Sequence, residues 1–219
     1  MDIYYLPLNC NSWDNEDMYL LNFLTLDRQS KICKYINTSD RKLSLYAALM
    51  TRMIIAIKTG SSVNTLNFIV SDNHKPKLYA NNFIDFNFSH TSDAILLTVS
   101  TQDLVGADIE LCQSIPEEVM PYVFHPHELN YINAATSTER TDRFYEIWTK
   151  KEAYTKMQGF GLSYDILSLN VLSNNIKDLL YTWKQGKYMC SVCSSSISST
   201  HLFHTIDEQT IRNYFKGIK

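Results

Sequence analysis

Gly106-Ala107-Asp108-Ile109-Glu110 alternates in the manner of a β-strand whose two faces meet different surroundings. Successive side chains of a strand point to opposite faces, so Ala107 and Ile109 share a buried face. Gly106, Asp108 and Glu110 then share the other face. Two carboxylates on one surface repel each other unless a cation lies between them, and oxygen ligands of this kind suit Mg²⁺. The stretch therefore indicates a metal site, with two solvated surface acids as the alternative when it is taken alone.

A second segment lies further along the chain and reads as a helix from about 143 to 158. It contains Trp148-Thr-Lys-Lys151-Glu152-Ala-Tyr-Thr-Lys156-Met-Gln-Gly159-Phe-Gly161-Leu162. Trp148, Glu152 and Lys156 are spaced four residues apart, which aligns them in one stripe of a helix. Gly159 is positioned to end the helix, and Gly161 permits a tight return of the chain. Taken alone, Glu152 and Lys156 form an ordinary surface ion pair worth about 0.2–0.5 kcal/mol.

The distribution of glycine links the two segments. The chain has only 6 glycines, and Gly106, Gly159 and Gly161 all fall within these segments. Glycine tolerates a positive φ and the close approach of another backbone, which other residues do not. Its concentration here indicates a tightly built site and not an ordinary surface.

Outward from these segments, the hydrophobic patterns predict helices followed by strands, twice over. The first half has a strand at 3–6, helices at 26–36 and 40–60, and strands at 66–70, 84–88, 94–99 and 105–111. The second half has helical signals at 116–134, the helix at 143–158, and strands at 168–172, 179–183 and 188–192. Asp40 and Gly60 are the expected caps of the second helix. This order predicts an α+β fold of two similar α/β lobes, residues 1–102 and 103–219.

Composition and charge narrow the class of protein. With 219 residues and 45% hydrophobic content, the chain can bury a substantial core. Its net charge of −3 offers no basic excess for a nucleic-acid backbone. The first residues lack the basic and apolar regions of a secretory signal, and no apolar run approaches the roughly 20 residues of a membrane helix. We therefore expect a cytoplasmic protein without nucleic-acid or membrane partners.

Taken together, the two segments resemble the signature of the 4′-phosphopantetheinyl transferases, G-x-D-x-E followed by W-x-x-K-E-x-x-x-K-x-x-G-x-G-L. The length is similar to that of the larger, Sfp-like branch, in which one chain forms a pseudo-dimer of two lobes. Upstream, Lys75-Pro76 and Phe86-Asn87-Phe88-Ser89-His90-Thr91 look like that branch's G-K-P and F-N-x-S-H-S elements. His74 and Thr91 depart from the pattern, because the family usually has glycine and serine there.

The resemblance implies an enzyme that moves the 4′-phosphopantetheine group of coenzyme A to a serine of an apo acyl or peptidyl carrier protein and releases 3′,5′-ADP. The implied cofactor is Mg²⁺, or Mn²⁺ in its place, held by Asp108, Glu110 and Glu152. The residues implied for coenzyme A are Arg28, Lys31, Lys75, Pro76, Ser89, His90 and Lys156. The first lobe would hold the nucleotide, and the second would carry the metal and the catalytic helix of a monomer.

Glu128 is the expected general base, beside Glu152 and Lys156 as the other catalytic residues. It lies in Phe124-His-Pro-His-Glu128, which resembles a family segment with the pattern F-x-x-x-E. A positioned carboxylate that removes the proton of a serine hydroxyl contributes about 10²–10⁴-fold to the rate. A glutamate on a helix surface is the alternative, and Lys156 or a metal-bound water could serve as the base instead.

Two other functions fit the same residues. Three carboxylates around Mg²⁺ with a lysine also describe a phosphohydrolase. A protein that binds coenzyme A or a carrier without turnover would keep the same site as well. Release of 3′,5′-ADP only when apo carrier is present separates the transferase from the hydrolase, and single-turnover labelling separates it from the binding protein.

Basic residues of the first lobe carry two further expectations. The 3′-phosphate of coenzyme A needs cations that lack acidic neighbours, and the sequence suggests Arg28, Lys31 and Lys75. An acidic carrier needs a local basic surface, and the sequence suggests Lys34, Arg41 and Lys42.

Overall fold

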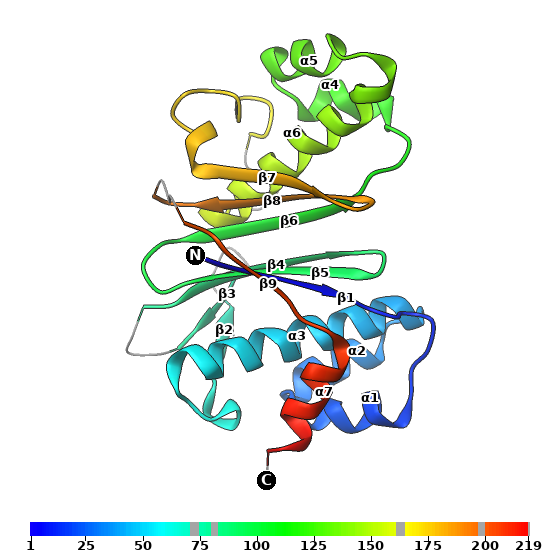
Figure 1. The fold of residues 1–219 in the computed structure, drawn as a ribbon, viewed down its shortest axis with the longest axis vertical. Coiled ribbons are helices and arrows are strands. Elements are labelled where there is room, and N and C mark those ends of the chain that lie inside the picture. Colours follow the sequence, from blue (N-terminus) through cyan, green and yellow to red (C-terminus); the bar gives the residue numbers. More distant parts are fainter. Residues whose placement is uncertain (71–74, 80–82, 161–164, 197–199, 219) are drawn as a thin grey trace.

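The computed structural model describes residues 1–70, 75–79, 83–160, 165–196 and 200–218. Two β-sheets lie as neighbouring layers, with helices on their outer sides (Figure 1). The strand order is β4-β5-β1-β9 in the first sheet and β6-β8-β7 in the second. The predicted α+β fold with two α/β lobes is therefore confirmed.

The first lobe is built on a sheet that is mostly antiparallel. β1 (Asp2–Pro7) pairs with β5 (Ala94–Ser100), and β5 pairs with β4 (Asp85–Thr91), both antiparallel. A short antiparallel pair, β2 (Phe68–Val70) and β3 (Pro76–Leu78), contacts this sheet through β4.

Helices cover the outer face of the first sheet. They are α1 (Asn15–Leu20), η1 (Leu21–Phe23), α2 (Leu26–Cys33), α3 (Thr38–Thr59) and η2 (Val63–Thr65). α3 presents an apolar face to the lobe core, where Leu45 and Leu49 are fully buried. Gly60 ends α3 with φ 66 as expected, but the helix begins after Asn37 and not at Asp40.

The second lobe packs one long helix on three antiparallel strands. β6 (Val105–Leu111) pairs with β8 (Tyr188–Ser194), which pairs with β7 (Leu180–Gln185). The long helix, α6 (Ser137–Gln158), packs on β6 and β8 and ends at Gly159 with φ 77. The shorter elements are η3 (Glu117–Val119), α4 (Met120–Val123), α5 (Pro126–Asn133) and η5 (Lys177–Leu179).

A core cluster joins the two sheets. Ile3 and Leu96 of the first sheet and Ile109 of the second are all buried in it. Because side chains alternate along a strand, the register that turns Ile109 into this core turns Asp108 and Glu110 to the other side of β6. The predicted strand and its two faces are therefore confirmed.

The end of the described chain returns to the first lobe, which corrects the predicted lobe boundary. β9 (Leu202–Thr205) pairs parallel with β1, and α7 (Glu208–Lys216) packs against α1 and α3. Residues 202–216 therefore belong with residues 1–102. The sequence pattern did not reveal this, because the strand that pairs with β9 lies near the other end of the chain.

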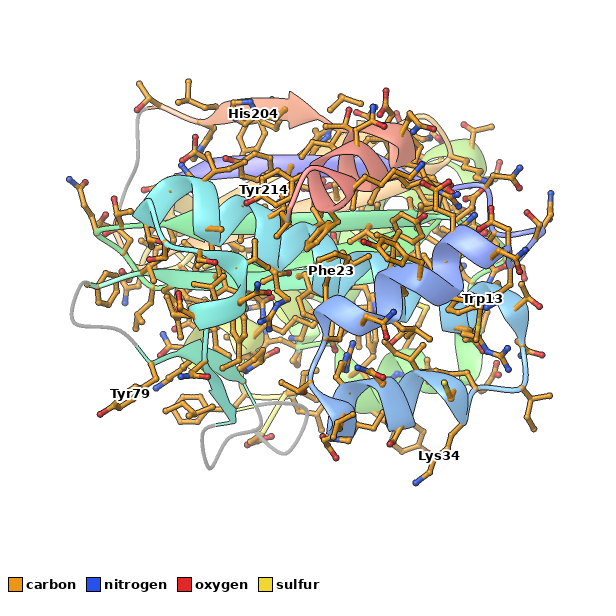
Figure 2. The ribbon with its side chains drawn as sticks, turned by 90° about the horizontal axis from the view of Figure 1, so that it is seen from below. Trp13, Phe23, Lys34, Tyr79, His204 and Tyr214 are labelled. Carbon is orange, nitrogen blue, oxygen red and sulfur yellow. The ribbon has the colours of Figure 1, made fainter. Side chains whose placement is uncertain are left out.

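Arg212 of α7 holds residues 202–216 on the first lobe through a cluster of ion pairs. Its guanidinium donates to Asp17 at 2.8 Å and to Glu208 at 2.6 Å. Lys42 joins the same cluster, 2.9 Å from Glu208, with a side chain that is 2% exposed. Lys42 is thus a buried structural residue, and its expected contact with a carrier is wrong. Lys34, just after α2, instead points into solvent (Figure 2).

Other elements also differ from the sequence expectations. Residues 168–172 form turns and irregular structure and not a strand, and α6 begins at Ser137, before the predicted 143. The sequence pattern predicts no element at α1, β3, β9 or α7, which are short. Short segments bury too few residues to display a periodicity that can be read without their packing partners.

Candidate active site

Gly106 allows β6 and α6 to approach closely. A methyl group added at Gly106 would lie 1.9 Å from the carbonyl oxygen of Ala153 and 2.6 Å from the backbone nitrogen of Met157. Side-chain carbons do not occur at such distances, so only glycine fits here. This approach brings the acids of β6 beside the stripe of α6 that carries Glu152 and Lys156.

Asp108 lies deep in the site and is 2% exposed. Its Oδ1 accepts hydrogen bonds from Lys156 Nζ at 2.5 Å and from Ser89 Oγ at 2.9 Å. Its Oδ2 is buried and has no hydrogen-bond partner within the described residues. A buried carboxylate oxygen without a partner is costly, which indicates that a further cation or donor belongs there.

Glu152 reaches the same group from α6. Its Oε2 lies 3.9 Å from Lys156 Nζ, and its Oε1 is buried without a hydrogen-bond partner in the part of the chain described. Burial raises the pKa of Glu152, although Lys156 opposes the rise, and the charge of Asp108 adds to it. The site therefore holds two buried carboxylate oxygens, one from each element, that await a partner.

Glu110 completes the acidic group. Trp148 Nε1 donates to Glu110 Oε1 at 3.4 Å. Burial raises the pKa of Glu110 to about 7, and the neighbouring charge of Asp108 contributes to the rise. The repulsion that the sequence predicts between these two acids is therefore present, and it is expressed as a carboxyl that titrates near neutral pH.

Lys156 supplies positive charge to these acids. Burial disfavours its charged form, but the attraction of Asp108, followed by that of Glu152 and Glu110, outweighs burial and raises its pKa. Lys156 is therefore protonated at neutral pH. It acts on this geometry as a cation and not as a proton acceptor.

The acids fit a hard divalent cation by their chemistry. Mg²⁺ takes oxygen ligands, and Asp108 and Glu152 each present a buried oxygen without a hydrogen-bond partner among the described residues. As the described side chains stand, no three acidic, histidine or cysteine residues are arranged to hold a metal. The ammonium of Lys156 lies between Asp108 and Glu152 instead. The donors therefore fit Mg²⁺, provided that Lys156 moves away from Asp108.

His90 and Arg28 continue the positive charge toward the first lobe. His90 is exposed at the end of β4, yet the protein around its ring removes part of its hydration and lowers its pKa. The positive charges of Lys156 and Arg28 lower that pKa further. Arg28 is held by Ser44, to whose hydroxyl it donates at 3.0 Å. An anion bound here would lie near two cations, Lys156 and Arg28. Its negative charge would also favour the protonated form of the His90 imidazole.

Two of the predicted nucleotide contacts already have acidic partners. Lys75 is 7% exposed, and its Nζ lies 2.6 Å from Asp85 Oδ2 and 2.9 Å from the carbonyl oxygen of Val105. Lys31 lies 3.2 Å from Asp27, one turn earlier on α2. The premise that these lysines lack acidic neighbours is therefore wrong. A buried ammonium such as that of Lys75 requires a counter-charge.

Glu128 does not fit the role of general base. Glu128 and Lys151 are both 0% exposed. Glu128 Oε2 accepts from Lys151 Nζ at 2.6 Å and from the backbone of His125 at 2.9 Å, and Oε1 accepts from the backbone of Val171 at 2.8 Å. A base must come within hydrogen-bond reach of the proton that it removes. The carboxylate is enclosed and fully engaged, so we assign it to a buried ion pair.

The site thus unites most of the predicted chemistry. Ser89, Asp108, Glu110, Glu152 and Lys156 lie together between β4, β6 and α6. The predicted contact Pro76 begins β3, next to Lys75. His74, Gly161 and Leu162 lie outside the described residues.

Sequence reasoning missed Asp85 and Lys151 as partners of the predicted residues. Asp85 had a readable signal, because it alternates with Asn87 and Ser89 along one strand and so shares their face. Lys151 had none, since a lysine in a helix is normally exposed and only the packing of α5 against α6 encloses it.

Comparison with known proteins agrees with this geometry. The family model described as the 4′-phosphopantetheinyl transferase superfamily matches residues 104–210, and the model described as 4′-phosphopantetheinyl transferase, N-terminal, matches residues 11–102. The chain is 28% identical over 218 residues to 4′-phosphopantetheinyl transferase gsp of Aneurinibacillus migulanus, covering 91% of this chain and 90% of that protein. It is 25% identical over 171 residues to 4′-phosphopantetheinyl transferase Sfp of Bacillus subtilis, covering 78% and 76%.

Proposed function

Because the chain belongs to the 4′-phosphopantetheinyl transferase superfamily, in its larger Sfp-like branch, we propose that it modifies a serine of an apo acyl or peptidyl carrier protein. Coenzyme A is the donor. The serine oxygen forms a bond to the phosphorus that carries the pantetheine arm, the diphosphate bond at that phosphorus breaks, and 3′,5′-ADP leaves with the electron pair. The proton of the serine passes to a base.

One observation carries the proposal. Asp108 and Glu110 of β6 face Glu152 and Lys156 of α6, and both elements fall within the residues that the superfamily model matches. Three acids and a cation, with two buried oxygens that have no hydrogen-bond partner among the described residues, suit a site that must hold both a metal and a diphosphate.

We propose that Asp108, Glu110 and Glu152 hold Mg²⁺, which when bound neutralises diphosphate oxygens and favours departure of 3′,5′-ADP. Lys156 then turns from Asp108 to the diphosphate. Arg28 and His90 extend the positive surface for the remaining phosphate, and positioning and charge supply most of the rate, as in other phosphoryl transfers.

We propose that one of the acids of the site is the general base. Lys156 is protonated at neutral pH, because its pKa is raised, so it is a poor acceptor. Glu152 has two carboxylate oxygens in the site, Oε1 without a hydrogen-bond partner among the described residues and Oε2 3.9 Å from Lys156 Nζ, so one oxygen can hold the metal while the other takes the proton of a bound hydroxyl. We therefore move the role that the sequence suggested for Glu128 to Glu152.

Mass spectrometry of apo carrier proteins tests the function. A panel of acyl and peptidyl carriers is incubated with the protein, coenzyme A and Mg²⁺, and 3′,5′-ADP is measured in parallel. The proposal expects the mass of phosphopantetheine on one serine of a carrier and an equal amount of 3′,5′-ADP. Release of nucleotide without any carrier would identify a phosphohydrolase, and tight binding of coenzyme A without either product would identify a binding protein.

The setting of the enzyme is also a proposal. We propose a monomer, because the lobe that supplies Ser89 and the lobe that supplies Asp108 are joined in one chain. We also propose that the enzyme works in the cytoplasm. Among the described helices, none combines the length and the apolar character that crossing a lipid bilayer requires. The net charge of −3 offers no basic excess for a nucleic-acid backbone, so we propose a carrier protein and coenzyme A as the partners.

A further inference from the structure

Polar side chains of β4 reach the edge of β6 at alternate positions. Asp85 Oδ2 accepts a hydrogen bond from the backbone N–H of Val105 at 2.7 Å. Asn87 Oδ1 accepts one from the backbone N–H of Ala107 at 2.9 Å. Asp85 and Asn87 are 4% and 8% exposed, so neither bond is replaced by bulk water. Beside the apolar core that joins the two sheets, the lobes are therefore linked by side chains of β4 that bond the backbone of β6.

These side-chain hydrogen bonds take the place of backbone pairing between β4 and β6. In the part of the chain that the structure describes, β6 pairs through its backbone with β8, and β4 pairs with β5. A buried N–H that loses its acceptor costs about 1–3 kcal/mol, so each bond favours one register of β4 on β6. A shift by one residue would turn Asp85 and Asn87 away from these donors.

The same face of β4 continues to a residue of the metal site. Ser89 lies two positions beyond Asn87, and its hydroxyl donates to Asp108 Oδ1 at 2.9 Å. The bond leaves Oδ2 of Asp108 as the oxygen without a hydrogen-bond partner among the described residues. Ser89 can make this contact only if β4 holds the register that Asp85 and Asn87 set. The three residues therefore act as a series, which we call the β4 ladder.

We propose that the β4 ladder orients the carboxylate of Asp108 for metal binding, with Asn87 as a positioning residue that acts through β6. The inference rests on the proposed function, because it takes Mg²⁺ as the metal and coenzyme A as the co-substrate. Hydrogen bonds that orient a ligand carboxylate typically change metal affinity or activity by about 10–100-fold when they are removed.

Thr98 provides a matched control. It is the cross-strand neighbour of Asn87 in the β4–β5 pair and is fully buried. Its hydroxyl donates to the backbone oxygen of Asp2 at 3.3 Å, a bond that joins β5 to β1 inside the first sheet. Thr98→Val thus removes a buried hydrogen bond of the same lobe, and it removes none of the hydrogen bonds of the ladder.

Calorimetric titration with coenzyme A, in the presence and absence of Mg²⁺, measures the effect of the metal as a ratio of two affinities. The wild type, Asn87→Ala, Ser89→Ala and Thr98→Val are compared well below their unfolding temperatures, which are recorded first. We expect Mg²⁺ to raise the affinity of the wild type for coenzyme A. We expect Asn87→Ala and Ser89→Ala to lose about 10–100-fold of this enhancement, while Thr98→Val keeps it.

The ratio of the coenzyme A affinities with and without Mg²⁺ distinguishes a change in metal binding from a change in coenzyme A binding alone. A lost contact between Ser89 and a phosphate lowers both affinities alike and leaves the ratio unchanged. Full metal enhancement in Asn87→Ala and Ser89→Ala, or an equal loss in Thr98→Val, overturns the inference. If Asn87→Ala unfolds, Ser89→Ala decides alone, since its half-buried hydroxyl is removed at little cost to stability. Absence of any enhancement in the wild type instead contradicts the metal-dependent function itself.

Discussion

The ammonium of Lys156 and the carboxylate of Asp108 lie 2.5 Å apart, at the point where the acids of β6 meet α6. A metal that binds Asp108 must therefore share this carboxylate with Lys156 or replace the lysine. Coenzyme A offers Lys156 another anionic partner in its diphosphate. We expect the metal and coenzyme A to bind cooperatively for this reason.

Lys156→Gln should have opposite effects on the two ligands. Without the ammonium, a divalent cation meets less repulsion and should bind more tightly when coenzyme A is absent, whereas coenzyme A should bind more weakly. Electron paramagnetic resonance with Mn²⁺ measures the first effect, and calorimetry measures the second. Lys150→Gln, which loses a pair with Glu146 on the same helix, is the control. Weaker Mn²⁺ binding in Lys156→Gln would contradict the prediction.

Replacement of the proposed metal ligands should abolish transfer. Asp108→Ala or Glu152→Ala removes a buried carboxylate oxygen that the metal requires, so the rate at saturating carrier should fall by about two orders of magnitude or more. EDTA should stop the wild type, and added Mg²⁺ should restore it. Glu139→Ala, at an exposed position of α6, serves as control. Near-normal turnover in both Asp108→Ala and Glu152→Ala would exclude these residues as the metal site.

Glu110 gives metal binding a dependence on pH. Burial, and then the charge of Asp108, raises its pKa from 4.5 to about 7, and a metal binds only the deprotonated carboxylate. Mg²⁺ affinity in the presence of coenzyme A should therefore rise up to about tenfold per pH unit below pH 7 and level off above it. Glu110→Gln should lose this inflection. An identical pH profile in Glu110→Gln would assign the titration to another group.

The raised pKa of Glu110 also makes the stability of the metal-free protein depend on pH, in the opposite direction to metal binding. Between pH 4.5 and about 7 the folded state retains a proton on Glu110 that the unfolded state has lost. The contribution of Glu110 to the free energy of unfolding therefore decreases as the pH rises through this window and is constant on either side. Urea denaturation in EDTA, compared with Glu110→Gln across this range, measures it.

Glu128→Gln should reduce stability more than catalysis. The substitution leaves the ammonium of Lys151 buried without its counter-charge, which typically costs about 3–5 kcal/mol. Urea denaturation measures the loss, and Glu139→Gln, which loses an exposed pair with Arg143, should cost at most about 1 kcal/mol. At a temperature where Glu128→Gln is folded, kcat should stay near that of the wild type. A large fall in kcat with unchanged stability would restore Glu128 as the base.

Gly106→Ala should separate β6 from α6. The new methyl group would clash with the backbone at Ala153 and Met157, so we expect a loss of about 1–3 kcal/mol or more and a weaker affinity for Mg²⁺. Gly217→Ala is the matched control, because a methyl group there comes no closer than 3.5 Å to its neighbours. Equal stability of the two variants would mean that the contact at Gly106 is loose.

The acidic strand and the catalytic stripe could be predicted from the sequence because each depends on local spacing. Alternation places Asp108 beside Glu110, and four-residue spacing places Glu152 beside Lys156, whatever surrounds them. The two-lobe order of helices and strands followed from the same periodicities. These features need no knowledge of which elements meet.

Long-range partners could not be predicted in the same way. The resemblance of its segment to the family pattern predicts Glu128 as a base, and only the packing of α5 on α6 buries it against Lys151. The sequence near Lys75 shows no acidic partner, because Asp85 comes beside it only when β4 is folded. Both errors concern a charge whose partner lies 10 or more residues away in the chain. The pair of Lys31 with Asp27 is different, because its four-residue spacing can be read from the sequence.

The return of β9 and α7 to the first lobe bears on how the protein folds during synthesis. β1 leaves the ribosome well before residues 202–216, which supply its neighbour β9 and the arginine of the Arg212 cluster. The first lobe therefore remains open at one sheet edge, with the acids of α1 lacking their arginine, until the second lobe has been translated. We expect the two lobes to become stable together, and the chain to depend on protection of that edge until its last strand is added.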